Sequence, residues 1–367
     1  MSFDTPVVLI LFNRPKRVRE LIDELRCVRP TRILVVADGP RDGYASDRDA
    51  CAGARAEVDN IDWPSTIERE FASTNLGCDR RVASGLDWAF SRVDRAIVLE
   101  DDILPNPSFF PWANSMLDRF GDDPSVAVVS GRNPLGRWAA SGGYNDHVRA
   151  RRGSIWGWAA TACAWRRTAA CVLSGDPARA LDDAAETGAD PLLAGHYGLA
   201  LRAYRCGVLD SWDVIFELQN FLLGGAAIVS PVNLVRNTGF GPGATHSLFA
   251  DDLRALTPVG TTSESRANTC PRFVQGFDAG FDRAALLVDL MSLCKDPPMA
   301  YRLATCLGRN KQLPLDDVTR HHLLPFAVPG ESLALIEHLT AQGVASRHFD
   351  LLRQTLREGT SARAGTM

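Results

Sequence analysis

The sequence predicts an α/β protein in which helices flank a mostly parallel sheet, with a mainly helical appendage towards the C-terminus. Two observations support this fold class. Short, continuous apolar runs occur at 7–12, 32–37, 96–99 and 126–130, as expected for buried parallel strands. Between them lie segments with helical periodicity, and the first has apolar residues at i, i+3, i+4 and i+7: Val18, Leu21, Ile22 and Leu25.

The first strand–helix unit begins at the apolar run 7–12. Asn13 is expected to cap the helix that follows, and Pro15 suits its first turn, where a missing N–H costs little. The second strand is predicted at 32–37. The polar segment 41–59 after it is expected to form loop and exposed helix.

A third, more exposed strand is predicted at 66–72, where apolar and polar residues alternate. The turn at 75–77 should open another helix. The next buried strand, 96–99, runs into three acids, and 126–130 is a further apolar strand.

The second half of the chain has a different character. Residues 132–153 show little periodicity and are expected to form a mobile loop. The aromatic segment 155–165 is predicted to be a strand. The remaining patterns predict helices at 191–205 and 211–222, a strand at 226–229, a loop at 233–247, and helices from 277 onward.

Composition excludes several classes of protein. With a formal charge of −4 and a pI of about 6.0, the 367-residue chain lacks a basic field that would attract nucleic acid. Its nine cysteines form no CxxC pair, which suits reduced thiols in the cytoplasm better than disulfides or a zinc ribbon. No signal peptide and no apolar stretch of about 20 residues is present, so no transmembrane segment is expected. Peripheral contact with the inner face of a membrane stays open.

Three consecutive acids, Glu100, Asp101 and Asp102, follow the strand at 96–99. Ligands of open α/β sheets bind at the carboxyl ends of the strands. Adjacent carboxylates repel one another unless a cation or hydrogen-bond donors compensate them. Their oxygens suit Mg²⁺ or Mn²⁺ held together with substrate phosphates. The alternative is an acidic exit from the strand on the surface.

Four segments together resemble the GT-A glycosyltransferases, which use nucleotide-diphosphosugar donors. They are VVLILFNRP at 7–15, VADGPR at 36–41, NLG at 75–77 and LEDD at 99–102, the last similar to the DxD element of that family in an E-D-D form. The resemblance covers about residues 6–250 and is closest to bacterial glycosyltransferase-like proteins. It implies a Rossmann-like GT-A fold, a nucleotide-sugar donor and a divalent ion, Mn²⁺ or Mg²⁺.

The resemblance also implies roles for single residues. Asp102 would be the direct metal ligand, and Glu100 and Asp101 would contact hydroxyls of the donor sugar or ribose. Contact with the nucleotide is implied for Phe12, Asn13, Arg14, Asp38, Asn75, Gly77 and Arg81. Two alternatives remain open: Asp38 as a turn-forming residue before Gly39, and Arg80 and Arg81 as solvated helix charges.

Trp156, Gly157 and Trp158 are candidates for the sugar or acceptor pocket. In a strand, the two indole rings would lie on the same face, and Gly157 would permit close approach of a ligand. Core packing is the alternative.

Asp213 is the candidate catalytic base, because it occupies the place where inverting members of the resembling family commonly carry theirs. Such a carboxylate takes the proton of the acceptor hydroxyl. Glu217, about one helical turn later, is the fallback base. The alternative for Asp213 is an acid that caps the helix or stabilises its first turn.

Other charged residues are weaker candidates. His246, in a Gly-rich segment, is a candidate second metal ligand, since imidazole suits Mn²⁺. The arginines of the 132–153 segment would clamp a diphosphate or acidic acceptor, or are only solvated: Arg132, Arg137, Arg149, Arg151 and Arg152.

The expected organisation is a GT-A domain at 1–255, with a donor half at 1–131 and an acceptor half at 132–255. A mainly helical region at 256–358 and a disordered tail at 359–367 follow. The expected function is metal-dependent, inverting transfer of a sugar, with a UDP-sugar favoured as donor. The acceptor would be a glycan, lipid-linked or other hydroxyl compound in bacterial surface-glycan synthesis. The alternatives are a sugar nucleotidylyltransferase, although an N-terminal Gly-rich phosphate loop is missing, and a non-catalytic nucleotide- or glycan-binding protein.

Overall fold

The computed structural model describes residues 3–139, 146–170, 189–205, 212–240, 253–262, 276–293, 329–343 and 353. Within these ranges, the main sheet has the strand order β3-β2-β1-β4-β8-β6-β9-β7, and a two-stranded ribbon pairs β5 with β10. The strands are β1 (Val7–Leu11), β2 (Arg32–Ala37), β3 (Thr66–Phe71), β4 (Arg95–Glu100), β5 (Ile103–Pro105), β6 (Val126–Ser130), β7 (Val148–Ala150), β8 (Trp158–Thr161), β9 (Ala226–Val229) and β10 (Val235–Asn237). The helices are α1 (Pro15–Leu25), α2 (Ala45–Ala56), α3 (Cys78–Phe90), α4 (Phe109–Phe120), α5 (Ala162–Ala169), α7 (Pro191–Arg205), α8 (Trp212–Leu222), α9 (Leu253–Leu256), α10 (Ala279–Leu293) and α13 (Pro329–Ala341), with a 3₁₀ turn η1 (Glu57–Asn60).

One half of the main sheet is parallel. β1 lies between β2 and β4, and β3 pairs with the outer side of β2. The central strands are buried, as their continuous apolar sequences require, whereas the edge strand β3 alternates between exposed and half-buried residues. The predicted strands at 7–12, 32–37, 66–72 and 96–99 are therefore confirmed, and their carboxyl ends share one edge of the sheet.

The other half of the sheet is mixed. β8 runs antiparallel between β4 and β6, β9 is parallel to β6, and β7 is antiparallel at the outer edge. Only β7 and β8 oppose the other strands of this sheet, so the predicted α/β class with a mostly parallel sheet is confirmed.

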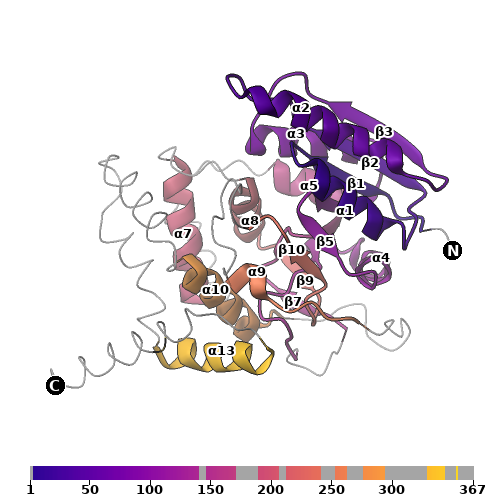
Figure 1. Ribbon diagram of the computed structural model, residues 1–367. Coiled ribbons are helices and arrows are strands. Elements are labelled where there is room, and N and C mark those ends of the chain that lie inside the picture. The colour runs from indigo at the N-terminus through magenta and orange to yellow at the C-terminus, as the bar shows by residue number, and fades with distance from the viewer. Residues whose placement is uncertain are drawn as a thin grey trace, which may run out of the picture.

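Helices cover both faces of the sheet (Figure 1). On one face, α1 and α4 bury an apolar stripe against the strands, including Leu21, Ile22, Phe109 and Phe110. On the other face, α3, α5, α8 and α10 share a second cluster with the strands. The close packing of α3 on β2 depends on Gly85, because a Cβ at this position would collide with the side chain of Val36.

The C-terminal helices are part of the core. α10 contributes Phe281 and Leu287 to the cluster with α3 and the strands, and Leu286 and Leu290 to a third cluster with α7 and α8. The predicted helical character after residue 277 is confirmed in the described ranges, whereas the predicted boundary at 255 stays a prediction. The predicted tail, 359–367, lies outside the described residues. None of the described helices has both the length and the apolar character needed to cross a membrane.

The prediction of a loop at 132–153 needs correction at Val148–Ala150, which is a strand, and the predicted mobility stays a prediction. Arg132, Asn133 and His147 are buried, and Val148–Ala150 is strand β7. The segment looks aperiodic because buried polar side chains interrupt the apolar pattern. Asn133, for example, accepts from the Leu135 backbone N–H and donates to the Ser230 carbonyl.

Two local predictions also need correction. The strand predicted at 155–165 is only Trp158–Thr161, because Thr161 caps a helix by accepting from the Ala164 N–H. Asn13 does not cap α1: the capping position is Arg14, and the Asn13 side chain donates instead to Asp47. Pro15 does open the helix, as predicted.

Candidate functional site

The acid triplet meets the end of β1 at the shared edge of the sheet. Since Ile10 pairs with Glu100, the residues that follow the two strands lie beside each other. The Phe12 backbone N–H donates to Asp101 Oδ2 at 3.0 Å. Arg14 Nη1 donates to Asp101 Oδ1 at 3.0 Å and to Asp102 Oδ2 at 2.8 Å. Strand pairing thus fixes one guanidinium between two carboxylates.

A fourth carboxylate, that of Asp213 on α8, lies near the acid triplet. Burial raises the pKa of Glu100 well above its ordinary value, and Asp102, Asp213 and Asp101 add to this effect by like-charge repulsion. Burial also raises the pKa of Asp101, although Arg14 opposes the shift. The predicted base Asp213 therefore does lie near the acid triplet, and the site concentrates negative charge.

Cys78, the first residue of α3, is a neighbour of this site that sequence reasoning missed. The residue is accessible to solvent at the rim, but protein atoms crowd its thiol. This crowding, followed by the charges of Glu100 and Asp213, raises the pKa of the thiol to about 12. No motif in the sequence signals the proximity, which arises because the turn at 75–77 directs the start of α3 towards β4.

Asp38, at the end of β2, holds that turn. Its carboxylate accepts from the backbone N–H groups of Gly39, Leu76 and Gly77 and from Asn75 Nδ2, at 2.8–3.1 Å. Two carboxylate oxygens offer about four acceptor positions, so these four donors nearly saturate Asp38. The turn-forming alternative is thus present in the structure, and a contact between Asp38 and a nucleotide stays a prediction.

An aromatic and guanidinium stack lies beside this turn. Arg41 packs over the ring of Tyr44 at 4.3 Å and faces Phe12 at 5.4 Å. The buried carboxylate of Asp47 accepts from the Arg41 side chain, which lowers the pKa of Asp47, and also accepts from Asn13. Tyr44 is 57% exposed. A fixed, exposed aromatic surface at strand ends suits a planar ring ligand.

The predicted nucleotide contact Arg81 lies on the inner side of α3. It is buried, and its guanidinium donates to the carbonyl and the carboxylate of Glu70 on β3. The structure therefore does not place it among the acids of the site, and its contact with a nucleotide stays a prediction. Arg80 is exposed.

The two tryptophans do not share a face, contrary to the strand prediction. Gly157 has a φ of 61°, which interrupts the alternation of an extended chain. Trp158 is fully buried and packs against Trp165 and Phe216, so core packing is its role. Trp156 is half-buried beneath Arg132, whose guanidinium lies 4.2 Å from the ring centroid.

Glu217, the fallback base, is anchored in a buried charge network. Its Oε2 accepts from Arg152 Nη2 and from the Tyr197 hydroxyl, both at 3.2 Å. Asp289 of α10 pairs with Arg152 at 2.9 Å and with Arg132 at 3.2 Å. Burial raises the pKa of Glu217 despite Arg152. The network links α7, α8 and α10 to the segment before β8.

The other arginines of the 132–153 segment do not form one clamp. Arg149 donates to Ser125 at 2.7 Å and lies 3.4 Å from Asp123. Arg151 packs over Phe277 at 4.0 Å. Only Arg132 and Arg152 of the group reach the network beside the candidate base.

The metal prediction depends on the acid triplet alone. No cluster of three or more His, Cys, Asp or Glu side chains with metal-binding geometry occurs within the described ranges. His246 lies outside the described residues. The side chain of Asp102 is 16% exposed, compared with 6% for Asp101, and Glu100 is half-buried.

No protein-family model matches this chain, and no curated protein matches it either.

Proposed function

We propose that the protein is a metal-dependent glycosyltransferase of GT-A type that transfers a sugar from a nucleoside diphosphate donor, with a UDP-sugar favoured. The observation that carries the proposal is the meeting of Arg14, the acid triplet and Asp213 at the carboxyl edge of the sheet. The likeness of four sequence segments to that family supports the same assignment. The acceptor would be a glycan, lipid-linked or other hydroxyl compound, and the reaction would take place in the cytoplasm at the inner face of the membrane.

The chemistry of the donor set fits a divalent cation. Glu100, Asp101, Asp102 and Asp213 repel one another, and the arginine that contacts two of them is Arg14. Mg²⁺ and Mn²⁺ prefer such oxygens and are commonly held by one or two carboxylates plus substrate phosphates. Asp102 would be the protein ligand. When bound, such an ion supplies positive charge to the diphosphate and so stabilises the leaving nucleotide.

The other roles in the proposed reaction fall to side chains of the protein. Arg14 holds Asp101 and Asp102 in place between the ends of β1 and β4. The Arg41–Tyr44 stack offers a planar surface for the nucleobase, close to the Asp38 turn. Asp213, on α8 near the acid triplet, would accept the proton of the acceptor hydroxyl. This role predicts inversion at the sugar carbon.

Two other functions make different predictions. A sugar nucleotidylyltransferase would release pyrophosphate from a nucleoside triphosphate and a sugar phosphate. A non-catalytic binding protein would bind nucleotide and never release it from a nucleotide-sugar. A transferase releases free nucleoside diphosphate slowly even without an acceptor, so donor hydrolysis separates the three.

The direct test measures UDP binding by calorimetry with Mn²⁺ and with EDTA. We expect tighter binding with Mn²⁺, and we expect Asp102→Asn to remove most of the difference. UDP at about 100 times its dissociation constant should add about 2.7 kcal/mol of stability. The matched control is Asp122→Asn, a substitution at an exposed acid away from the site, which should bind as the wild type does. Equal affinity with and without metal would contradict the metal assignment, and GDP, dTDP and CMP in parallel would identify the base.

A further inference from the structure

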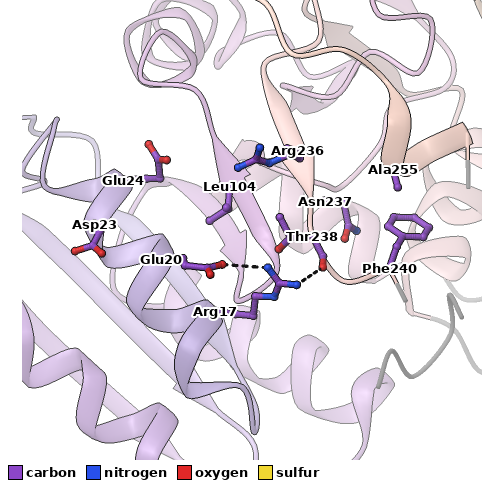
Figure 2. Close-up of a pocket in the computed structure, with 10 residues that line it drawn as sticks. All are labelled: Arg17, Glu20, Asp23, Glu24, Leu104, Arg236, Asn237, Thr238, Phe240 and Ala255. Atoms are coloured by element: carbon purple, nitrogen blue, oxygen red, sulfur yellow. Dashed lines mark hydrogen bonds and ion pairs between the residues drawn. The ribbon is translucent and has the colours of Figure 1, made fainter. Parts of the chain in front are cut away.

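A cavity lies beside Thr238 and Gly239, which contact Asp102. It has a volume of about 620 Å³ and runs between the outer face of α1 and the β5–β10 ribbon (Figure 2). Leu104 of β5 lies between the two walls, and Phe240 and Ala255 lie at one end. This volume falls within the range of about 300–1,000 Å³ that small-molecule sites occupy. We call it the α1–β10 groove.

The lining of the groove carries both signs of charge. Arg17 and Arg236 provide N–H donors, whereas Glu20, Asp23 and Glu24 provide acceptors. Such a lining does not suit an apolar ligand. Three carboxylates against two guanidinium groups also disfavour a diphosphate, so the groove does not suit the donor of the proposed reaction.

Hydroxyl groups match this lining, because each one can donate and accept a hydrogen bond. Phe240 adds an aromatic surface, which suits the C–H face of a sugar ring. Its ring is fixed edge-to-face on Trp156 at 5.7 Å and lies 5.5 Å from the Arg254 guanidinium. Polar side chains beside a fixed aromatic ring are the combination expected for a carbohydrate.

Part of the lining is already held in place. Arg17 donates to Glu20 at 3.0 Å and to the Thr238 carbonyl at 2.8 Å, and both contacts are drawn in Figure 2. Asn237 Oδ1 accepts from the Gly239 N–H at 2.7 Å. In the described part of the chain, the side chains of Glu24 and Arg236 have no hydrogen-bond or ion-pair partner. These two groups are therefore available to a ligand.

The groove and the acid triplet share one thin wall. The Thr238 N–H and hydroxyl both donate to the Asp102 carbonyl, at 2.8 and 3.0 Å. Gly239 lies so close to Asp102 that a Cβ there would collide with the carboxylate. A ligand in the groove would therefore be separated from Asp102 by Thr238 and Gly239 alone.

We infer that the α1–β10 groove binds an uncharged carbohydrate, at a site that Thr238 and Gly239 separate from the acid triplet. Carbohydrate binding by the groove does not rest on the proposed glycosyl transfer. The lining holds three carboxylates and two guanidinium groups, and Asp23 also pairs with Arg26 beside it, so no net positive charge favours an acidic saccharide and a neutral glycan is the occupant.

Saturation-transfer NMR on the full chain tests the inference. The probes are four neutral disaccharides, namely maltose, lactose, cellobiose and N,N′-diacetylchitobiose, together with lactobionate as the anionic counterpart of lactose. We expect binding of at least one neutral disaccharide and weaker binding of lactobionate than of lactose. Arg236→Ala and Glu24→Gln should each weaken binding at least tenfold. Lys16→Ala, an exposed cation on α1 outside the groove lining, should leave it unchanged.

Carbohydrate binding by the groove and the transferase proposal would be contradicted by different results. No signal from any neutral disaccharide, or signals that persist in both groove variants, would overturn the inference. Calorimetry with UDP on the same variants reports the donor site separately. If saccharides bind the groove but UDP does not bind, the transferase proposal falls and a carbohydrate site remains. If UDP binds and saccharides do not, the donor assignment stands and the groove is not a carbohydrate site.

Discussion

At the scale of single residues, Asp213 and Glu217 lie on one face of α8 but have different surroundings. Asp213 faces the acid triplet, and Glu217 is bound by Arg152 and Tyr197. A carboxylate fixed by a guanidinium is a poor proton acceptor, because the positive charge stabilises its ionised form. Burial opposes this effect at Glu217 and raises its pKa. The Asp213 carboxylate accepts instead from the Val214 backbone N–H at 2.9 Å, and we expect Asp213 rather than Glu217 to act as the base.

This difference predicts the outcome of two conservative substitutions. Asp213→Asn should lower kcat by about two to four orders of magnitude while UDP binding stays near wild type, because an amide cannot take the proton. Glu217→Gln should lower stability more than kcat, since it removes one of the two carboxylates that pair with the buried Arg152. Transfer assays and urea unfolding on both variants measure this. If both variants keep at least a tenth of the activity and still bind UDP, no base lies on α8.

The reactivity of Cys78 should reflect both the crowding of its thiol and the nearby charges of Glu100 and Asp213. With a thiol pKa of about 12, only a very small fraction of Cys78 is thiolate at pH 8. Because the thiolate is the reactive species, we expect iodoacetamide to modify Cys78 about 100-fold more slowly than the exposed Cys27. Asp213→Asn removes one of the neighbouring charges and should speed the reaction at Cys78 alone. Peptide mass spectrometry over time gives both rates. Equal rates at the two cysteines would mean that neither the crowding nor the acids raise the pKa of the Cys78 thiol.

At the scale of secondary-structure elements, the position of α3 decides the geometry of the site. The helix begins at Cys78, beside the acids, and Gly85 lets it pack directly on β2. On the same face of the sheet, α10 supplies Asp289, which pairs with both Arg132 and Arg152. Arg132 in turn covers Trp156. The C-terminal helices therefore support the candidate site as well as the hydrophobic core.

Two glycine substitutions test the packing of α3. Gly85→Ala should destabilise the protein by about 1–3 kcal/mol, because the added methyl group collides with Val36 in a packed core. Gly195→Ala is the matched control in α7, where the new methyl group meets no atom within 4 Å. It should stabilise the protein by up to about 1 kcal/mol through helix propensity. Urea unfolding measures both changes. A stabilising Gly85→Ala would show that α3 does not lie this close to β2.

At the scale of the whole molecule, more of the sheet than of the candidate site could be predicted from the sequence. Continuous apolar runs identify buried strands whatever surrounds them, so β1, β2, β4 and β6 follow from the sequence. The acid triplet could be placed at a strand end for the same reason. The burial of Trp158 away from Trp156 could not be predicted, because the positive φ at Gly157 reverses the face on which the Trp158 side chain is expected. Nor could the pairing of Asp289 with Arg132, since residues 157 apart in sequence meet only through tertiary folding.

The last prediction concerns the stability of the whole chain as pH changes. Asp282 of α10 is 2% exposed, and its carboxylate accepts from the backbone N–H groups of Arg151 and Arg152. Burial outweighs these hydrogen bonds and raises its pKa from 3.8 to about 6. The folded chain therefore holds this proton more tightly than the unfolded chain does. Because the unfolded state binds fewer protons in this range, the contribution of Asp282 to stability is greatest below about pH 4 and is lost as the pH rises through about 6.

Asp282→Asn removes this titration. The stability of the wild type relative to the variant should therefore fall by up to about 3 kcal/mol between about pH 4 and pH 7. Urea unfolding of both proteins at several pH values gives this difference, from which all other titrating groups cancel. The control is Asp122→Asn, an exposed acid whose substitution should leave the difference from wild type independent of pH over this range. A wild-type-to-Asp282→Asn difference that stays constant, or that grows with pH, would mean that Asp282 is ionised in the folded protein throughout. Its contacts with the two backbone N–H groups would then outweigh its burial.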